Sequence, residues 1–138
     1  MAYLVDTNIV SEACKKEPAS HVVDWLSTNT SGLYLSVVTI EEMRFGELMM
    51  PKGKRRSKLS EMIDGLVAAY AGKILCFDIA AAEKCAEFHE LAISSGRTPT
   101  IEDLMIAAIA QVNRLTVATR NVRDFEYLGV SVLNPYEG

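Results

Sequence analysis

The sequence is poor in the residues that form disulfides, bind zinc or act as nucleophiles. It has only three cysteines, Cys14, Cys76 and Cys85, none of them in a CxxC pair, and two histidines, His21 and His89. This argues against a disulfide framework and a zinc site. Both histidines fall inside amphipathic stretches among apolar neighbours, which predicts structural or surface roles. No P-loop and no GxSxG motif is present, so a serine nucleophile is not expected.

Long apolar runs are missing as well. Charges interrupt every candidate before it reaches the roughly 18 residues that a membrane span needs. The N-terminus lacks the basic segment and apolar stretch of a secretory signal. The chain has 138 residues, of which 49% are hydrophobic and 23% charged, as in an ordinary globular protein. We therefore expect a single domain over residues 1–138, in the cytoplasm and without membrane contact.

Positive charge is scarce overall but locally concentrated. The net charge is -4, from 18 acidic and 14 basic residues, which argues against coating nucleic acid by broad charge. Five bases nevertheless lie within Lys52–Lys58 (KGKRRSK), and Arg114, Arg120 and Arg123 gather near the C-terminus. A solvated loop and helix start would explain the first cluster. The alternative is contact with phosphates or with an acidic partner.

Short apolar runs alternate with longer amphipathic segments along the chain. The runs predict strands at 2–5, 33–36, 73–77, 115–119 and 130–133. Between them, helical spacing predicts helices at 8–15, 17–30, 37–50, 55–72, 80–96 and 100–114, with glycine stops at Gly72 and Gly96. Such alternation is typical of an α/β sandwich with a mainly parallel central sheet.

Polar residues follow two of these predicted strands directly. Asp6 closes the first strand, and Thr119, Asn121 and Asp124 lie at or just after the end of the strand at 115–119. Ligands of open parallel sheets bind beyond the carboxyl ends of the strands. If these two strands are neighbours, all four side chains lie at one edge of the sheet.

Two further acids lie on predicted helices. Glu42 has no basic partner three or four residues away and shares a stripe with Val38, Phe45 and Met49 that is expected to be buried. A buried carboxylate without a cation is costly, although a position at the wet rim of the core would also explain it. Asp103 follows Thr100 by three residues, which a capping box explains without any function.

The same ambiguity holds for Asp124, for which Asn121 is a plausible N-cap. The four acidic residues together indicate a metal site more strongly than any one of them does. Asp6, Glu42, Asp103 and Asp124 come from four separate elements, and their convergence would require a divalent cation. Oxygen ligands of this kind suit Mg²⁺ or Mn²⁺, which activate water and take phosphate as a further ligand.

Four blocks of the sequence closely resemble PIN-domain ribonucleases, in particular the VapC/FitB-like toxins of type II toxin–antitoxin pairs. The blocks are LVDTNIVSE, IEEMRFG (40–46), EDLMIAAIA (102–110) and TVATRNVRDF (116–125), in matching order and spacing along essentially the whole chain. The resemblance implies a PIN-like three-layer sandwich and a Mg²⁺- or Mn²⁺-dependent endoribonuclease. It also implies a homodimer and inhibition by a small antitoxin that carries a DNA-binding domain.

Carried over by position, Asp6 and Asp103 are expected to hold the principal metal ion. Glu42 and Asp124 would bind through water or activate the nucleophile, while Thr119 and Asn121 orient the site. Some FitB-like relatives have an aspartate where this chain has Asn121, which leaves open a catalytically weak or inactive PIN fold that acts as a binding or regulatory subunit.

For an RNA substrate, the basic residues become candidate backbone contacts. These are Lys54, Arg55 and Arg56 in the first cluster, with Arg120 and Arg123 nearer the site. The methionine-rich segment ELMM (47–50) is a candidate for burying an antitoxin helix, although core packing is the favoured interpretation.

Overall fold

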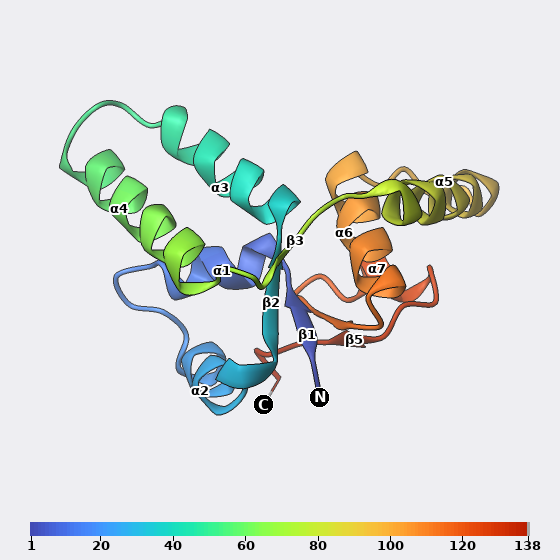
Figure 1. Ribbon diagram of the computed structural model, residues 1–138, viewed down its shortest axis with the longest axis horizontal. Coiled ribbons are helices and arrows are strands. Elements are labelled where there is room, and N and C mark those ends of the chain that lie inside the picture. The colour runs from blue at the N-terminus through green and yellow to red at the C-terminus, as the bar shows by residue number, and fades with distance from the viewer. Residues whose placement is uncertain (138) are drawn as a thin grey trace.

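The computed structural model describes residues 1–137, in which helices cover both faces of a five-stranded sheet (Figure 1). The strands are β1 (Tyr3–Val5), β2 (Leu33–Ser36), β3 (Ile74–Leu75), β4 (Thr116–Ala118) and β5 (Val132–Leu133). They lie in the order β3-β2-β1-β4-β5, and all four pairings are parallel. The expected α/β fold with a mainly parallel sheet is therefore confirmed.

The helices are α1 (Thr7–Ala13), α2 (Ser20–Thr28), α3 (Val37–Leu48), α4 (Lys54–Ala69), α5 (Ile79–Ser94), α6 (Ile101–Val112) and α7 (Arg123–Glu126), with a 3₁₀ turn at Thr30–Gly32. The predicted ranges match these bounds to within about three residues, except that α7 and the 3₁₀ turn were not predicted. Gly72 and Gly96 follow α4 and α5 with φ of 82° and 73°, the left-handed geometry that ends a helix.

Alternation along the strands builds two cores. Tyr3 and Val5 of β1 point to the side of α1–α4, where they pack with Ile9, Leu35 and Ile63. The residue between them, Leu4, points to the other side and packs beneath α5–α7. This period of two is what a parallel sheet covered on both faces requires. Figure 1 shows the two groups of helices on opposite sides of the central strands.

The strand order places a topological switch in the middle of the sheet. From β1 the chain proceeds to β2 and β3 on one side and later to β4 and β5 on the other. The connections on the two sides of such a point diverge and leave a crevice at the carboxyl ends of the strands. Val5 of β1 is paired with Ala118 of β4, so Asp6 and Thr119 emerge side by side into that crevice.

The predicted burial of α3 was wrong in part. Val38 is buried, but the side chains of Phe45 and Met49 are 57% and 70% exposed, and the helix buries Met43 and Glu47 instead. The inward face carries the carboxylate of Glu47 because Arg44 and Arg56 neutralise it, and Arg56 belongs to the next helix, where helical spacing does not link it to Glu47. Most of ELMM is therefore surface, contrary to the favoured interpretation as core.

Within residues 1–137, no helix has the length and apolar character needed to cross a bilayer.

Candidate active site

Asp6 lies where β1 ends and α1 begins. It is the N-cap of α1, and its backbone N–H continues the sheet by donating to the carbonyl of Ala118 at 2.9 Å. Its Oδ1 accepts from the N–H of Thr7 at 2.8 Å, and its Oδ2 accepts from Oγ1 of Thr119 at 2.7 Å. The side chain is only 5% exposed. Burial raises the pKa of Asp6, and the hydrogen bonds from Thr119 and Thr7 oppose that rise.

Thr119 orients this carboxylate. Its Oγ1 accepts from Nδ2 of Asn8 at 3.3 Å and from the backbone N–H of Asn121 at 3.0 Å. A hydroxyl has two lone pairs and one proton, so the proton is left for Asp6. Asp6 is therefore held as an acceptor, and the predicted orienting role of Thr119 has a geometric basis.

Glu42 reaches the same crevice from α3. Its Oε1 accepts from Oγ1 of Thr7 at 2.7 Å, and that hydroxyl is also 3.0 Å from Oγ1 of Thr39. Thr7 thus links the carboxylate of Glu42 to the start of α1, next to Asp6. The side chain of Glu42 is half-buried, which agrees with a place at the rim.

Asp103 joins from α6, on the other side of the sheet. Its N–H donates to Oγ1 of the N-cap Thr100 at 3.2 Å, so the predicted cap exists. The carboxylate has a second role. Burial, followed by the negative charges of Asp6 and Asp124, raises the pKa of Asp103 to about 6, and Glu42 adds to the rise. The four predicted acids therefore lie close enough to repel one another.

Asp124 and Asn121 do not form the predicted cap. Helix α7 begins at Arg123 after Val122, and no side chain caps it. The N–H of Asp124 instead donates to the carbonyl of Asn121 at 3.0 Å, which makes a tight turn. Both side chains are exposed at the mouth of the crevice. The carboxylate of Asp124 is thus left available to a ligand.

The donor set fits a hard divalent cation by its chemistry. Within the described part of the chain, no three Asp, Glu, His or Cys side chains are already arranged to bind one ion together. Burial raises the pKa of Asp6 and of Asp103, and repulsion from the other carboxylates of the set adds to the rise. A cation with oxygen preference, such as Mg²⁺ or Mn²⁺, is the partner that would offset this repulsion.

A groove of about 760 Å³ begins beside Thr7 and Glu42 and runs between α1, α3 and α4. Its walls are apolar in part, and its far end is basic. The basic side chains that line it are Lys15, Lys16, Arg55 and Lys58. The groove therefore joins the acidic crevice to positive charge.

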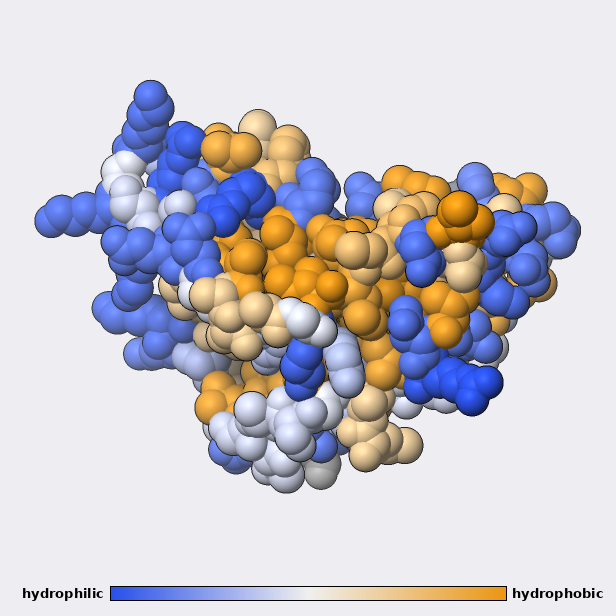
Figure 2. Space-filling view, in the orientation of Figure 1, coloured by the Kyte–Doolittle hydropathy of each residue, from blue (hydrophilic) through white to orange (hydrophobic). Residues whose placement is uncertain are grey.

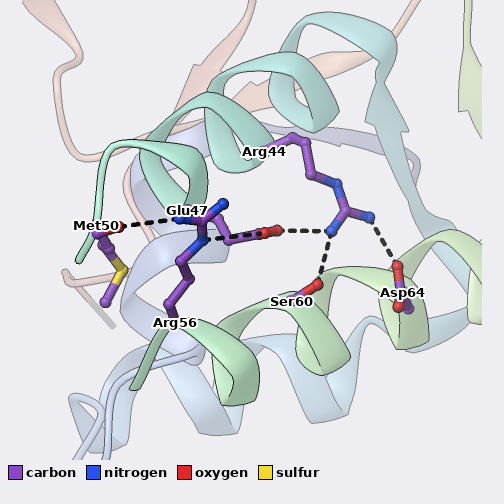
Figure 3. Close-up of polar contacts among 6 residues, drawn as sticks. All are labelled: Arg44, Glu47, Met50, Arg56, Ser60 and Asp64. Carbon is purple, nitrogen blue, oxygen red and sulfur yellow. Dashed lines mark hydrogen bonds and ion pairs between the residues drawn. The ribbon is translucent and has the colours of Figure 1, made fainter. Parts of the chain in front are cut away.

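The predicted basic contacts fall into different environments. Lys54 and Arg55 are exposed at the start of α4. Arg56 is turned inward, with its Nε 4.0 Å from Glu47 Oε2 and an N–H donated to the carbonyl of Met50 (Figure 3). Glu47 is 6% exposed, so Arg56 helps to neutralise a buried charge. The structure thus gives Arg56 a structural partner that the sequence did not reveal.

Arg44 completes the network around the buried Glu47. It donates to Glu47 at 2.7 Å and to Asp64 of α4 at 2.8 Å, and so joins α3 to α4 (Figure 3).

Near the C-terminus, Arg120 and Arg123 are both exposed, and the guanidinium of Arg120 lies 4.6 Å from the centre of the Tyr136 ring. Sequence reasoning missed Thr7, Asn8 and Thr39 as site residues. The first two stand directly after Asp6, which was their only signal.

Comparisons with known proteins identify the family of this fold. The family model of the PIN domain matches residues 3–130. VapC ribonuclease Y4jK of Sinorhizobium fredii is 38% identical over 136 residues, which is 97% of each chain. Toxin FitB of Neisseria gonorrhoeae is 36% identical over 96% of this chain and 97% of its own.

A solved structure extends the likeness to three dimensions. The crystal structure of FitAcB from Neisseria gonorrhoeae superimposes with a TM-score of 0.91 at 35% identity and covers 99% of both chains. The family model, the two relatives and the superimposed structure each match nearly the full length of this chain. The chain is a member of the PIN-domain family, with relatives of the VapC and FitB type.

Proposed function

We propose that this protein is a Mg²⁺- or Mn²⁺-dependent endoribonuclease and the toxin of a type II toxin–antitoxin pair. The observation that carries the proposal is that Asp6 and Glu42 are linked through Thr7 at the crevice between β1 and β4, with Asp103 and Asp124 near enough for their charges to act on Asp6 or on each other. The names of the relatives support the reaction class, since one is called a ribonuclease and another a toxin.

In this proposal, Asp6 and Asp103 are the principal metal ligands. Asp6 presents two oriented acceptor oxygens, because Thr7 donates to Oδ1 and Thr119 donates to Oδ2. A bound divalent cation supplies a water of lowered pKa and stabilises charge on the scissile phosphate. Glu42 is half-buried and Asp124 is exposed at the rim, where either carboxylate would accept a proton from the attacking water or help to hold the cation. Asn121 orients the mouth of the site through its turn with Asp124.

The RNA strand would meet positive charge on both sides of the crevice. Lys54 and Arg55 lie at the start of α4 with free side chains suited to phosphate, and Arg55 lines the groove. Arg120 and Arg123 follow β4 on the other side. We assign Arg56 mainly to the buried contact with Glu47.

The partners that we propose are an antitoxin and a second copy of the chain. Figure 2 shows apolar surface across the middle of one face, between the α3–α4 pair and the α5–α6 pair. Exposed apolar side chains of these elements include Phe45, Leu48 and Met49 of α3, Ile79 of α5 and Ile101 of α6. Surface of this kind supports protein–protein contact. The antitoxin proposal rests on the toxin-type relatives, and a cytoplasmic setting agrees with the free cysteines.

The test is cleavage of total cellular RNA by the purified, partner-free protein, with Mg²⁺, with Mn²⁺ and with chelator. Metal-dependent cleavage is expected, and Asp103→Asn should abolish it. Glu102→Gln removes the neighbouring acid of the same helix turn and should leave cleavage intact. If a folded, partner-competent protein cuts no RNA with either metal, the alternative of an inactive binding subunit replaces the proposal.

A further inference from the structure

The C-terminal segment folds back onto α1 through Tyr136. The hydroxyl of Tyr136 donates to Oε1 of Glu12 at 2.8 Å, and its backbone N–H donates to Oδ1 of Asn134 at 2.9 Å. Glu12 is a buried carboxylate that also accepts from Nζ of Lys15 at 2.8 Å and from the N–H of Ala19 at 2.9 Å. Tyr136 is therefore fixed at both its backbone and its hydroxyl.

The side chains of Tyr136 and Glu12 position two basic side chains, those of Arg120 and Lys15. The guanidinium of Arg120 lies 4.6 Å from the ring centre of Tyr136, and the ammonium of Lys15 is tied to the same Glu12 that holds the ring. Lys15 and Arg120 are close enough to repel, since Arg120 lowers the pKa of Lys15 against the larger raising effect of Glu12. Among residues 1–137, no carboxylate forms an ion pair with Arg120.

The pair of cations is coupled to the acidic crevice. Arg120 directly follows Thr119, whose hydroxyl donates to Asp6, and the N–H of Arg120 is 3.4 Å from Oδ1 of Asn8. Lys15 lines the groove that begins at Thr7 and Glu42. An anion held by these two cations would thus lie at the edge of the site.

Stacking prepares the Arg120 side chain for phosphate. A guanidinium that lays its face on a ring keeps the N–H donors at its edge free for a forked contact with a phosphate. An ammonium alongside supplies a second, less directional charge. In a protein with a net charge of -4, such a cluster is a local reversal of sign.

We propose that Tyr136 and Glu12 are positioning residues that hold Arg120 and Lys15 as a clamp for an RNA phosphate flanking the cleavage point. The proposal rests on the proposed ribonuclease function and extends its RNA contact at Arg120 to Lys15, Glu12 and Tyr136. Neither Tyr136 nor Glu12 touches the reacting atoms.

The experiment measures steady-state cleavage and equilibrium binding of a fluorescein-labelled single-stranded RNA, with binding recorded in chelator so that it does not depend on catalysis. Tyr136→Leu should raise KM and the RNA Kd about fourfold, as expected for loss of an exposed cation–π contact, and leave kcat within about twofold. Arg120→Ala should have a larger effect and reduce the salt dependence of binding by roughly 0.7 in the log–log slope.

The double variant isolates the positioning role. If Tyr136 acts through Arg120, then Tyr136→Leu adds nothing to Arg120→Ala, whereas a merely structural role would give multiplied losses. Arg120→Lys keeps the charge but not the planar fork, so it should weaken binding with an unchanged salt slope. It serves as a second test if the leucine variant does not fold.

Lys73→Ala is the matched control. Lys73 also stacks on a tyrosine, 4.9 Å from the ring centre of Tyr34, but it precedes β3 and so lies at the opposite edge of the sheet. Its removal should leave KM, Kd and the salt slope unchanged. Unchanged RNA binding in folded Tyr136→Leu, or multiplied losses in the double variant, would overturn the clamp. Binding that weakens as expected in a protein that cuts no RNA would overturn the ribonuclease proposal instead.

Discussion

Replacement of Asp103 by asparagine should stabilise the metal-free protein at neutral pH. Burial and the neighbouring carboxylates raise the pKa of Asp103 from 3.8 to about 6. Ionisation therefore costs more in the folded chain than in the unfolded chain, by about 3 kcal/mol for a rise of this size. Because the side chain is only half-buried, solvent screening reduces the expected gain to about 1.5 kcal/mol.

The sign of the effect fixes its pH dependence. A carboxyl group with a raised pKa stabilises the fold fully below its unfolded value near 4, and this contribution is lost as the pH rises through about 6. The free energy of unfolding of Asp103→Asn should exceed that of the wild type by about 1.5 kcal/mol at pH 7.5. The difference should shrink steadily as the pH falls toward 4.

The assay is urea unfolding followed by circular dichroism in chelator, at one protein concentration and several pH values. Glu102→Gln is the control, because Glu102 occupies the same first helix turn and its loss removes a similar helix-dipole interaction. Saturating Mn²⁺ should reverse the order, since only the wild type would gain binding energy. A loss of stability in metal-free Asp103→Asn equal to that in Glu102→Gln would refute the account of four mutually repelling carboxylates.

Three further predictions concern stability and assembly. Tyr127→Phe should raise the free energy of unfolding by about 1 kcal/mol, because the buried hydroxyl of Tyr127 has no hydrogen-bond partner among residues 1–137, whereas Tyr136→Phe should lower it by a similar amount. Arg44→Ala should cost about 2 kcal/mol in urea unfolding, because it leaves the buried carboxylate of Glu47 with a weaker partner. Phe45→Glu should shift the proposed homodimer to monomer in light scattering, since it places charge in the exposed apolar surface of α3.

Each of these has a result that counts against it. Equal changes in Tyr127→Phe and Tyr136→Phe would mean that hydroxyl partners do not decide the effect. An Arg44→Ala variant as stable as the wild type would show that Glu47 does not depend on it. A Phe45→Glu protein that stays dimeric would move the interface away from α3.

Much of the fold was predictable because the spacing of apolar residues differs clearly between strands and helices. The period of two in short apolar runs and helical spacing between them gave the strands and helices, and the glycines marked where helices end. The meeting of Asp6 with Thr119 followed from a single assumption, that their strands are neighbours, and the pairing of β1 with β4 confirms it. Sequence patterns were sufficient to predict contacts within one element and contacts that the pairing of strands determines.

The features that the sequence did not predict have a common physical cause. The burial of Glu47 instead of Phe45 depends on Arg44 and Arg56, and the latter comes from the next helix, where no spacing rule links it to Glu47. The hydroxyl of Thr7 joins Glu42 across 35 positions, and Tyr136 reaches Glu12 across 124. Such long-range polar contacts depend on how the packed elements meet, and a single sequence does not carry that information in its local pattern.

The most direct measurement is Mn²⁺ binding to the RNA-free protein, followed by electron paramagnetic resonance of the free ion. The account predicts that the wild type and Glu102→Gln bind Mn²⁺ alike, whereas Asp6→Asn and Asp103→Asn lose the site while remaining folded. Mn²⁺ binding that survives in both of these variants, or is missing from a wild-type protein that still cuts RNA in chelator, would contradict the claim that the carboxylates beyond β1 and β4 converge to hold a catalytic cation.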